Sequence, residues 1–534
     1  MAQTNRAKGA VRSPVWAARS KLRLAHIRGG PAEAAALIHR GLWDKTPAGL
    51  LPAARYGSEF VEELLKAKIN AVCLTWSPGF SVEGDVPQWE VAARLLPLLK
   101  KKKIRAFAEL SLTGCFAAEF LPRVTEAKSW LERQPDGKPI APVNDNCLQL
   151  NVQHEGWRQY LAHKVRMAAG AGFDGFFFSD VVCKPAEGGD FLTFLIDAAR
   201  TGRIPEIEDF AFYTNSTEPA VVAAANLKWL ECGERQVPDE RKFGANIPHL
   251  KALFELGGRD RTLFCGIPGH STEKEACIAA AEILASGGAC HGLRAPANYQ
   301  AFCASNSDIF GGADPVSVLG FLADDQSGTF ARVRADAALF ERLLGRAIQF
   351  DIIPLSAVDA FDLKKYRVLS ALHLDTVPDE LSAKLAAFYK NGGAVLYATT
   401  PPEDPAAPPP APRTETTEGK GAAIHYAAPL SDETRKLLLD DLSARLDPQL
   451  ISVEDATHVV ALLWGKNTRR WVHVINYASK NSDVTITLPG CGGRKLSVLS
   501  PDAPPPQLSV LETGNANARF TLKGVETFAV VVVE

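Results

Sequence analysis

Features that mark several protein classes are missing from the sequence. No segment reaches the ~18 consecutive apolar residues of a membrane span, and the N-terminus has no apolar signal core. The ten cysteines include no CxxC pair and no Cys/His cluster, which argues against zinc and favours buried free thiols in a reducing compartment. The formal net charge of −2 gives no reason to expect nucleic acid or a membrane as the main partner. We therefore expect a cytoplasmic protein.

Common nucleotide and metal motifs are missing as well. The sequence contains no Walker A or HExxH motif. Residues 304–490 hold no cysteine, so this part of the chain cannot use the cysteine nucleophile of an amidotransferase. We expect neither a metal nor an organic cofactor.

What the chain does have is length and an ordinary globular composition. Its 534 residues are too many for one core, so two to four domains are expected. Hydrophobic residues make up 46% and charged residues 22%, as in typical globular proteins. Residues 1–30 hold seven Lys or Arg and no acid, which favours a disordered leader over a binding arm.

Strand-like and helix-like segments alternate between about residues 66 and 296. Segments with helical periodicity include 58–66, 88–99 and 273–285. Eight strands in this alternating order predict a (β/α)₈ barrel, although the third strand is weak and a seven-stranded or distorted barrel stays open. The expected strands are 70–76, 105–112, 147–152, 173–180, 210–215, 227–232, 263–267 and 289–294.

Two further units follow the expected barrel. Apolar runs at 316–322, 348–354, 367–372 and 394–399, with helical stretches between them, predict a second α/β unit. Beyond about residue 451, short β-rich runs separated by polar and Gly/Pro-rich turns predict a small antiparallel β-sandwich. These runs are 459–464, 470–476, 484–488, 496–499 and 527–533.

The stretch 171–180, Ala-Gly-Phe-Asp-Gly-Phe-Phe-Phe-Ser-Asp, is the most informative part of the chain. Its unbroken aromatic run after a glycine suits a strand buried on both faces. Chemistry in a (β/α)₈ barrel gathers at the carboxyl ends of the strands. Asp180 would lie at that end, whereas Asp174 would lie at the other end and hold the entry to the strand.

Three stretches resemble known glycosidases. Residues 157–180 resemble strand four of glycoside-hydrolase-like TIM barrels, and 280–288 resemble their last helix and strand. Residues 362–369, together with 388–394, resemble the flavodoxin-like trimerisation domain of family 42 β-galactosidases. The resemblance implies a TIM barrel, a flavodoxin-like α/β domain and a C-terminal β-sandwich in one glycosidase, with the second domain driving assembly into a homo-oligomer, a trimer or a dimer.

The expected domain boundaries follow from this order. They are a leader at 1–30, a catalytic barrel at 31–312, a flavodoxin-like domain at 313–430 and a β-sandwich at 431–534. Family 42 enzymes carry a glutamate after strand four. Ser179 and Asp180 stand in that region here, so the family's catalytic pair is not carried over. An aspartate there is similar to the nucleophile of amylase-like and fucosidase-like barrels.

Glycoside hydrolysis needs two carboxyl groups across the scissile bond. Asp180 is the candidate nucleophile, with a capping or loop carboxylate as the alternative. Glu231 follows the mostly apolar 227–230, and apolar neighbours raise the pKa of a carboxyl as a general acid requires. Glu234 fits a surface loop better than a catalytic role.

A sugar site also needs flat apolar surfaces and groups that bind hydroxyls. Glu109 is either such a group or a buried partner of Arg105. For each candidate named below, the alternative is a structural role in core packing or in a loop. The candidate substrate-binding residues are Trp76, Glu109, Tyr213, Asn215, Trp229, Glu234, His270, His291 and Arg294.

The sequence thus predicts a glycoside hydrolase acting on oligosaccharides or glycoconjugates, with a retaining mechanism favoured. An inverting glycosidase with the same carboxyl pair stays open. So does a catalytically silent carbohydrate-binding protein on a glycosidase scaffold, because barrels host many functions.

Overall fold

The structure is a computed structural model that describes most of the 534-residue chain. The chain divides into two compact units, 1–233 with 260–267 and 289–307, and 234–259 with 268–288 and 308–534. No described helix is long and apolar enough to cross a membrane. The described residues are 15–17, 22–27, 35–36, 56–179, 185–205, 207, 209–214, 227–230, 244–257, 263–266, 272–291, 296–324, 330–374, 376–399, 411–418, 420–428, 430–454, 457–513 and 516–534.

The first unit contains an eight-stranded parallel sheet whose strands follow one another in sequence order. The outermost strands β1 and β10 do not pair within the described residues, so the sheet is not a closed barrel there. The predicted parallel α/β fold is confirmed in this coarser form. The strands are β1 (Leu24–Ile27), β2 (Ala71–Ser77), β3 (Arg105–Ser111), β6 (Gly175–Ser179), β7 (Ala211–Thr214), β8 (Leu227–Leu230), β9 (Leu263–Gly266) and β10 (Ala289–His291).

Two predictions were wrong, that residues 147–152 form a strand of this sheet and that residues 1–30 form only a leader. Residues 147–152 do not join the sheet. Their strand β5 (Cys147–Gln149) instead pairs antiparallel with β4 (Gly114–Phe116) in a separate two-stranded sheet. The missing eighth strand is β1, which pairs in parallel with β2 and comes from the segment expected to be a leader. Because β5 pairs with β4, it does not take the third position that was expected in the parallel sheet.

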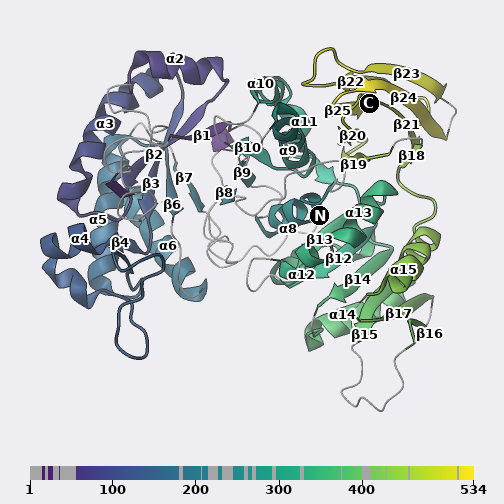
Figure 1. Cartoon of the computed structure of the whole chain (residues 1–534), viewed down its shortest axis with the longest axis horizontal. Helices are drawn as coiled ribbons and strands as arrows, with labels where there is room; N and C mark the ends of the chain where they lie inside the picture. Colours follow the sequence, from purple (N-terminus) through teal and green to yellow (C-terminus); the bar gives the residue numbers. More distant parts are fainter. Residues whose placement is uncertain are drawn as a thin grey trace. The chain divides into compact units, whose positions relative to one another are not determined.

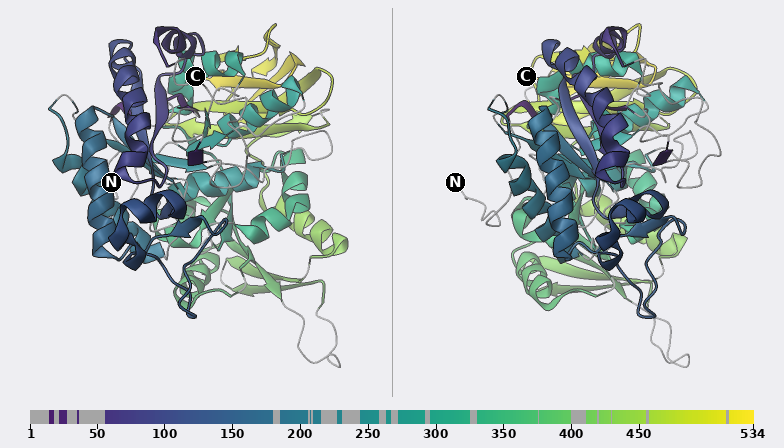
Figure 2. Two further views of the ribbon diagram at one scale, coloured as in Figure 1. Left: turned by 60° about the vertical axis from the view of Figure 1, so that its left-hand side comes forward. Right: turned by 90° about the vertical axis from the view of Figure 1, so that its left-hand side faces the viewer.

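Helices of the first unit cover one face of the sheet (Figures 1 and 2). Alternation along each strand sends one set of side chains toward these helices and the other set to the opposite, inner face. In β6, Phe176 and Phe178 join the helix-side core, while Phe177 joins the inner cluster. The first unit's helices are α2 (Ser58–Lys66), α3 (Val82–Lys101), α4 (Ala117–Arg123), α5 (Glu155–Ala171), α6 (Pro185–Thr201) and α10 (Ala297–Ser305), with 3₁₀ turns η1 (Val15–Ala17) and η3 (Thr125–Ser129).

Gly175 shows why β6 begins with glycine. A Cβ atom there would lie 2.4 Å from the Ala211 carbonyl oxygen and 2.5 Å from the Phe107 ring. The missing side chain lets Phe107 fill the inner face beside β6. All five residues of β6 are buried, as the aromatic run predicted.

The second unit contains the sheet that was predicted to be flavodoxin-like, in the order β13-β12-β14-β15-β17-β16. Only the β16–β17 pair of this sheet is antiparallel. The four predicted strands are confirmed, and α14 (Asp379–Lys390) ends before Asn391, as the Asn-Gly-Gly turn predicted. The strands are β12 (Leu319–Ala323), β13 (Phe350–Pro354), β14 (Val368–His373), β15 (Ala394–Thr399), β16 (Arg413–Glu418) and β17 (Gly421–Ala427).

The helices of the second unit include two that the sequence assigned to the barrel, α8 (Ile247–Gly257) and α9 (Glu273–Ala285). Thr272 and Glu275 form a capping box that begins α9. The others are α12 (Ala331–Ala335), α13 (Ala337–Gly345), α14 (Asp379–Lys390) and α15 (Asp432–Arg445), with turns η4 (Leu355–Ala360) and η5 (Leu363–Lys365); α11 (Ser307–Phe310) spans the boundary of the units.

Two antiparallel sheets complete the chain, in the orders β11-β19-β20-β25-β22 and β18-β21-β24-β23. Side chains from both sheets form one apolar core, among them Val472, Val531, Ile486 and Phe520. The predicted C-terminal antiparallel region is confirmed. Its strands are β11 (Asp314–Pro315), β18 (Ser452–Glu454), β19 (Val459–Lys466), β20 (Arg469–Asn476), β21 (Ser482–Pro489), β22 (Leu496–Leu499), β23 (Gln507–Thr513), β24 (Asn517–Val525) and β25 (Phe528–Val533).

Candidate active site

A polar pair lies on the inner face of the parallel sheet. His26 Nε2 and Glu109 Oε2 are 2.7 Å apart, and their side chains are 8% and 17% exposed. The Thr75 hydroxyl donates to the same carboxylate oxygen over 3.3 Å. The strand register explains the meeting, because His26 lies opposite Cys73 and Thr75 lies opposite Glu109 on adjacent strands.

Aromatic side chains border this pair. Phe177 contacts the His26 ring edge-on, with centroids 5.9 Å apart, and stacks on Tyr213 at 4.6 Å. Tyr213 is fully buried, and burial raises the pKa of its phenol well above 10, so the hydroxyl is neutral. A histidine and a carboxylate in direct contact can hold a proton between them and bind hydroxyl groups of a ligand. Phe177 and Tyr213 are themselves buried, so they pack around the pair, and only its polar groups are candidates for contact with a ligand.

The same cluster has the composition of a metal site. One ligand atom each from His26, Cys73 and Glu109 lies within 4.8 Å of the others. Nitrogen, sulfur and carboxylate oxygen are the ligands that zinc takes in proteins. The sequence did not reveal this set, because its members are separated by tens of residues and show no metal-ligand spacing.

Most of the predicted site residues, or their side chains, lie outside the described part of the chain. Asp180 directly follows β6 and Glu231 directly follows β8, and both lie outside the described residues. For Trp229 on β8 and His291 on β10 the structure describes the strand and not the side chain. Asn215, Glu234, His270 and Arg294 also lie outside the described residues. The catalytic pair therefore stays a prediction.

Trp76, expected at a sugar site, lies on the helix-side face of the sheet. The residue is 4% exposed, and its ring stacks on that of Trp89 with centroids 4.9 Å apart. Its indole N–H donates to the Lys164 carbonyl oxygen over 3.2 Å. Trp76 thus packs the core between sheet and helices, away from the inner face that carries His26 and Glu109.

Asp174, directly before β6, has its own set of partners. Asp174 pairs with Arg105 at 2.6 Å and accepts a hydrogen bond from the Ala106 amide, so it holds the entry to its strand as predicted. Arg105 is therefore not the partner of Glu109, and the alternative that paired them was wrong. Glu109 pairs with His26 instead, which leaves the sugar-hydroxyl interpretation of Glu109 as the proposal.

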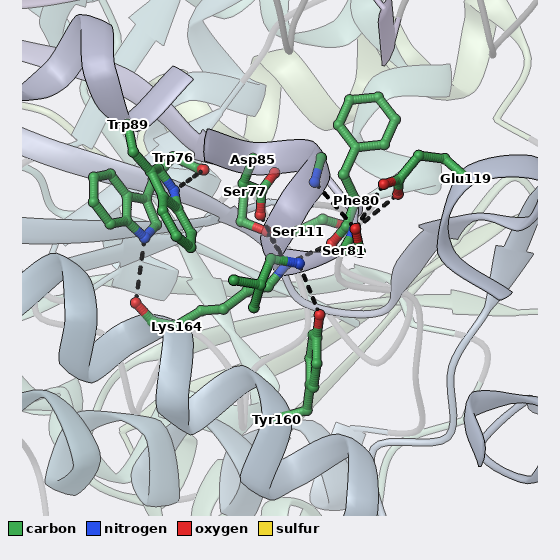
Figure 3. A network of polar contacts seen from close by, with 12 residues as sticks. Trp76, Ser77, Phe80, Ser81, Asp85, Trp89, Ser111, Glu119, Tyr160 and Lys164 are labelled. Carbon is green, nitrogen blue, oxygen red and sulfur yellow. Dashed lines mark hydrogen bonds and ion pairs between the residues drawn. The ribbon is translucent and has the colours of Figure 1, made fainter. Parts of the chain in front are cut away.

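A buried ion pair fixes the turn that follows β2 (Figure 3). Lys164 Nζ on α5 lies 2.7 Å from Asp85 Oδ2 on α3, and the two side chains are 1% and 0% exposed. The ammonium also donates to Ser77 Oγ at 2.9 Å and to the Phe80 carbonyl oxygen. Burial raises the pKa of Asp85 to about 6, while the nearby Lys164 charge lowers it. The end of β2, the turn and two helices are thereby joined at one point.

A second set of contacts holds the same turn from the other side. Glu119 on α4 accepts hydrogen bonds from the Ser81 amide and hydroxyl at 2.8 and 2.7 Å. The Tyr160 hydroxyl accepts from the Val82 amide at 2.9 Å. Ser81 also caps α3 through the Gly84 amide. Figure 3 shows these side chains converging on residues 77–85 from β2, α3, α4 and α5. This carboxyl-end turn is thus held in one conformation.

Comparisons with known proteins identify the fold. No protein-family model and no curated protein sequence matches the chain. Among solved structures, α-L-fucosidase isoenzyme 2 from Paenibacillus thiaminolyticus superposes with a TM-score of 0.67 at 13% identity, covering 96% of this chain and 99% of that one. The β-galactosidase from Rahnella sp. R3 gives 0.65 at 12% identity, covering 98% and 100%.

A third structure, a family 42 β-galactosidase from G. stearothermophilus, gives a TM-score of 0.61 at 12% identity, covering 96% of this chain and 98% of that one. At such identities the likeness concerns the fold alone. The expected resemblance is confirmed at that level: over nearly its full length, the chain shares the multidomain fold of family 42 β-galactosidases and related glycosidases.

Proposed function

We propose that the protein is a glycoside hydrolase that cleaves oligosaccharides or glycoconjugates. The observation that carries the proposal is the His26–Glu109 pair, which lies beside aromatic rings on the inner face of a parallel sheet. Both residues belong to the carboxyl-terminal halves of their strands, where parallel α/β enzymes place their chemistry. The glycosidase-like fold supports the same function.

The proposed mechanism is retaining and uses two carboxyl groups. Asp180, directly after β6, attacks the anomeric carbon while Glu231, directly after β8, protonates the departing oxygen. Water deprotonated by Glu231 then releases the sugar from Asp180. Glu109 accepts a hydrogen bond from a sugar hydroxyl, and His26 fixes the orientation of its carboxylate. β6 and β8 both pair in parallel with β7, so their carboxyl ends lie at the same edge of the sheet.

Two other functions remain as alternatives. An inverting enzyme would use the same residues with a wider gap between the carboxyl groups, and NMR of the first product anomer separates the two cases. A silent carbohydrate-binding protein would bind sugar without hydrolysis at any pH. We further propose that the flavodoxin-like sheet mediates a homo-oligomer, a trimer or a dimer, which light scattering would measure.

Glu109→Gln tests the site residue that the structure describes. The amide keeps the size of the side chain and removes the charge that binds a hydroxyl. Losing a hydrogen bond to a charged group costs about 1.5–3 kcal/mol, so kcat/KM on a cleaved glycoside should fall roughly 10- to 100-fold. Glu90→Gln changes an exposed glutamate of α3 and serves as the matched control. Equal kcat/KM for Glu109→Gln and the control would remove Glu109 from the site.

A further inference from the structure

A cavity of about 800 Å³ lies in the flavodoxin-like part of the second unit. It opens where β14 and β15 begin, beside the last turn of α14 and the end of α15. Small-molecule sites in proteins typically have volumes of about 300–1,000 Å³. The cavity thus has the size of a ligand site, and it belongs to a different unit from the His26–Glu109 pair.

The charged lining of the cavity has one sign. Among the described residues, Lys364, Arg367 and Arg445 line it, and no Asp or Glu does. Lys420 is close by, since its Cβ atom lies 3.6 Å from where a Cβ on Gly392 would be. A cluster of cations raises the local concentration of anions.

The three lining cations differ in how they are held. Arg367 Nη1 donates to the carbonyl oxygens of residues 446, 447 and 448 at 3.2–3.3 Å, which fixes the guanidinium without neutralising it. Arg445 is paired with Glu415 at 2.5 Å. The Lys364 ammonium makes no hydrogen bond or ion pair to any residue in the described part of the chain. Lys364 and Arg367 are therefore the cations available to an anion.

The remaining lining consists of apolar side chains and glycine backbone. The rings of Tyr366 and Phe388 line the cavity, and so do Gly392 and Gly393. A Cβ atom on Gly393 would lie 2.2 Å from the Phe388 ring, so glycine is what lets this ring lie against the backbone. A flat ring surface beside fixed cations suits a ligand that has both a ring body and an anionic group.

We propose that this cavity binds an anionic carbohydrate, a sugar that carries a carboxylate or a sulfate group, as a second site apart from the candidate active site. The anionic group lies between Lys364 and Arg367, and the sugar ring packs on Phe388. The carbohydrate part of the proposal rests on the proposed glycosidase function, whereas the anionic part rests on the cavity alone. Such a site would hold a charged glycan near the enzyme without taking part in bond cleavage.

Isothermal titration of the full chain tests the proposal. The probes are a uronate-containing disaccharide, a sulfated disaccharide, their uncharged counterpart and inorganic sulfate. We expect at least one charged disaccharide to bind more tightly than both the uncharged sugar and inorganic sulfate, and to bind more weakly as salt increases. Absence of binding by both charged disaccharides, or equal binding of the uncharged one, would overturn the proposal. Tighter binding of inorganic sulfate would overturn the sugar assignment.

Three variants locate the binding. Lys364→Gln removes an exposed, unpaired cation and should weaken binding roughly threefold to fivefold. Lys364→Gln combined with Arg367→Gln should weaken it at least about tenfold. Lys436→Gln, an exposed lysine of α15 that is not part of the lining, carries the same charge change as Lys364→Gln and should leave binding unchanged. Equal losses in Lys364→Gln and Lys436→Gln would contradict a specific site. Binding is measured independently of hydrolysis, so these affinities can be measured even if the protein proves not to be a glycosidase.

Discussion

Replacing Lys164 with methionine should destabilise the first unit strongly at neutral pH. The substitution keeps the length and apolar stem of the side chain and removes the ammonium that contacts Asp85, Ser77 and Phe80. Asp85 is 0% exposed, so its carboxylate would lose its cation where water cannot replace it. Removing one partner of a buried ion pair costs about 3–5 kcal/mol, and we expect a loss in this range at pH 7.5.

The pH dependence gives this prediction a second test. Burial raises the pKa of Asp85 from 3.8 to about 6, so the folded protein binds a proton that the unfolded chain has already released. In the wild type, the contribution of Asp85 to stability should therefore fall as pH rises from about 4 to 6, by up to about 3 kcal/mol. Without Lys164 the pKa of Asp85 rises further, because the charge that lowers it is gone. The deficit of Lys164→Met should thus be smaller at pH 5 than at pH 7.5.

Urea unfolding at both pH values measures these differences. Tryptophan fluorescence reports on the region, because Trp76 and Trp89 stack beside the ion pair. Lys100→Met, at an exposed position of α3, is the control and should change stability by less than about 0.5 kcal/mol. A cost below about 1 kcal/mol for Lys164→Met at pH 7.5, or a larger cost at pH 5, would refute the reasoning.

Two further substitutions test other parts of the account. Gly175→Ala should lower the free energy of unfolding in urea by about 1–3 kcal/mol, because the added Cβ would lie 2.4 Å from the Ala211 oxygen. At the control Gly137→Ala an added Cβ has nothing within 4 Å, so only the backbone strain of a positive φ should appear. An unchanged stability of Gly175→Ala would contradict the packing. Added zinc should inhibit hydrolysis by binding His26, Cys73 and Glu109, and Cys73→Ser should weaken this inhibition at least about tenfold. EDTA should leave the activity of the purified enzyme intact. Loss of activity in EDTA would instead make the cluster a resident metal site.

Much of the fold was predictable because buried strands and helix ends have recognisable sequence patterns. The aromatic run of β6 identified a strand buried on both faces, and the Asn-Gly-Gly after α14 identified the end of that helix. β1 was missed because its four residues, Leu-Ala-His-Ile, lie in a basic segment and become a strand only by pairing with β2 more than 40 residues later. The apolar run at β5 was misassigned because local composition does not state which partner a strand will take.

The site was harder to predict than the fold, since it depends on which face a side chain occupies. Trp76 ends an expected strand, and alternation along that strand turns its ring toward the helices. Glu109 was named as a candidate, but the sequence did not indicate its partner His26, which lies 83 residues away. Only the register of β1, β2 and β3 brings that histidine to the carboxylate.

Hydrolysis of a panel of aryl α- and β-glycosides by the wild type, Asp180→Asn and Glu231→Gln tests the proposed function most directly. The account predicts that the wild type releases the aglycone from one sugar and that both substitutions abolish turnover. Since an aryl leaving group needs little protonation, Glu231→Gln should slow the first step, departure of the aglycone, less than the second step, attack of water on the glycosyl-enzyme, and the block in the second step stops turnover. Turnover that survives in Asp180→Asn, or sugar binding by the wild type with no hydrolysis at any pH, would contradict the account.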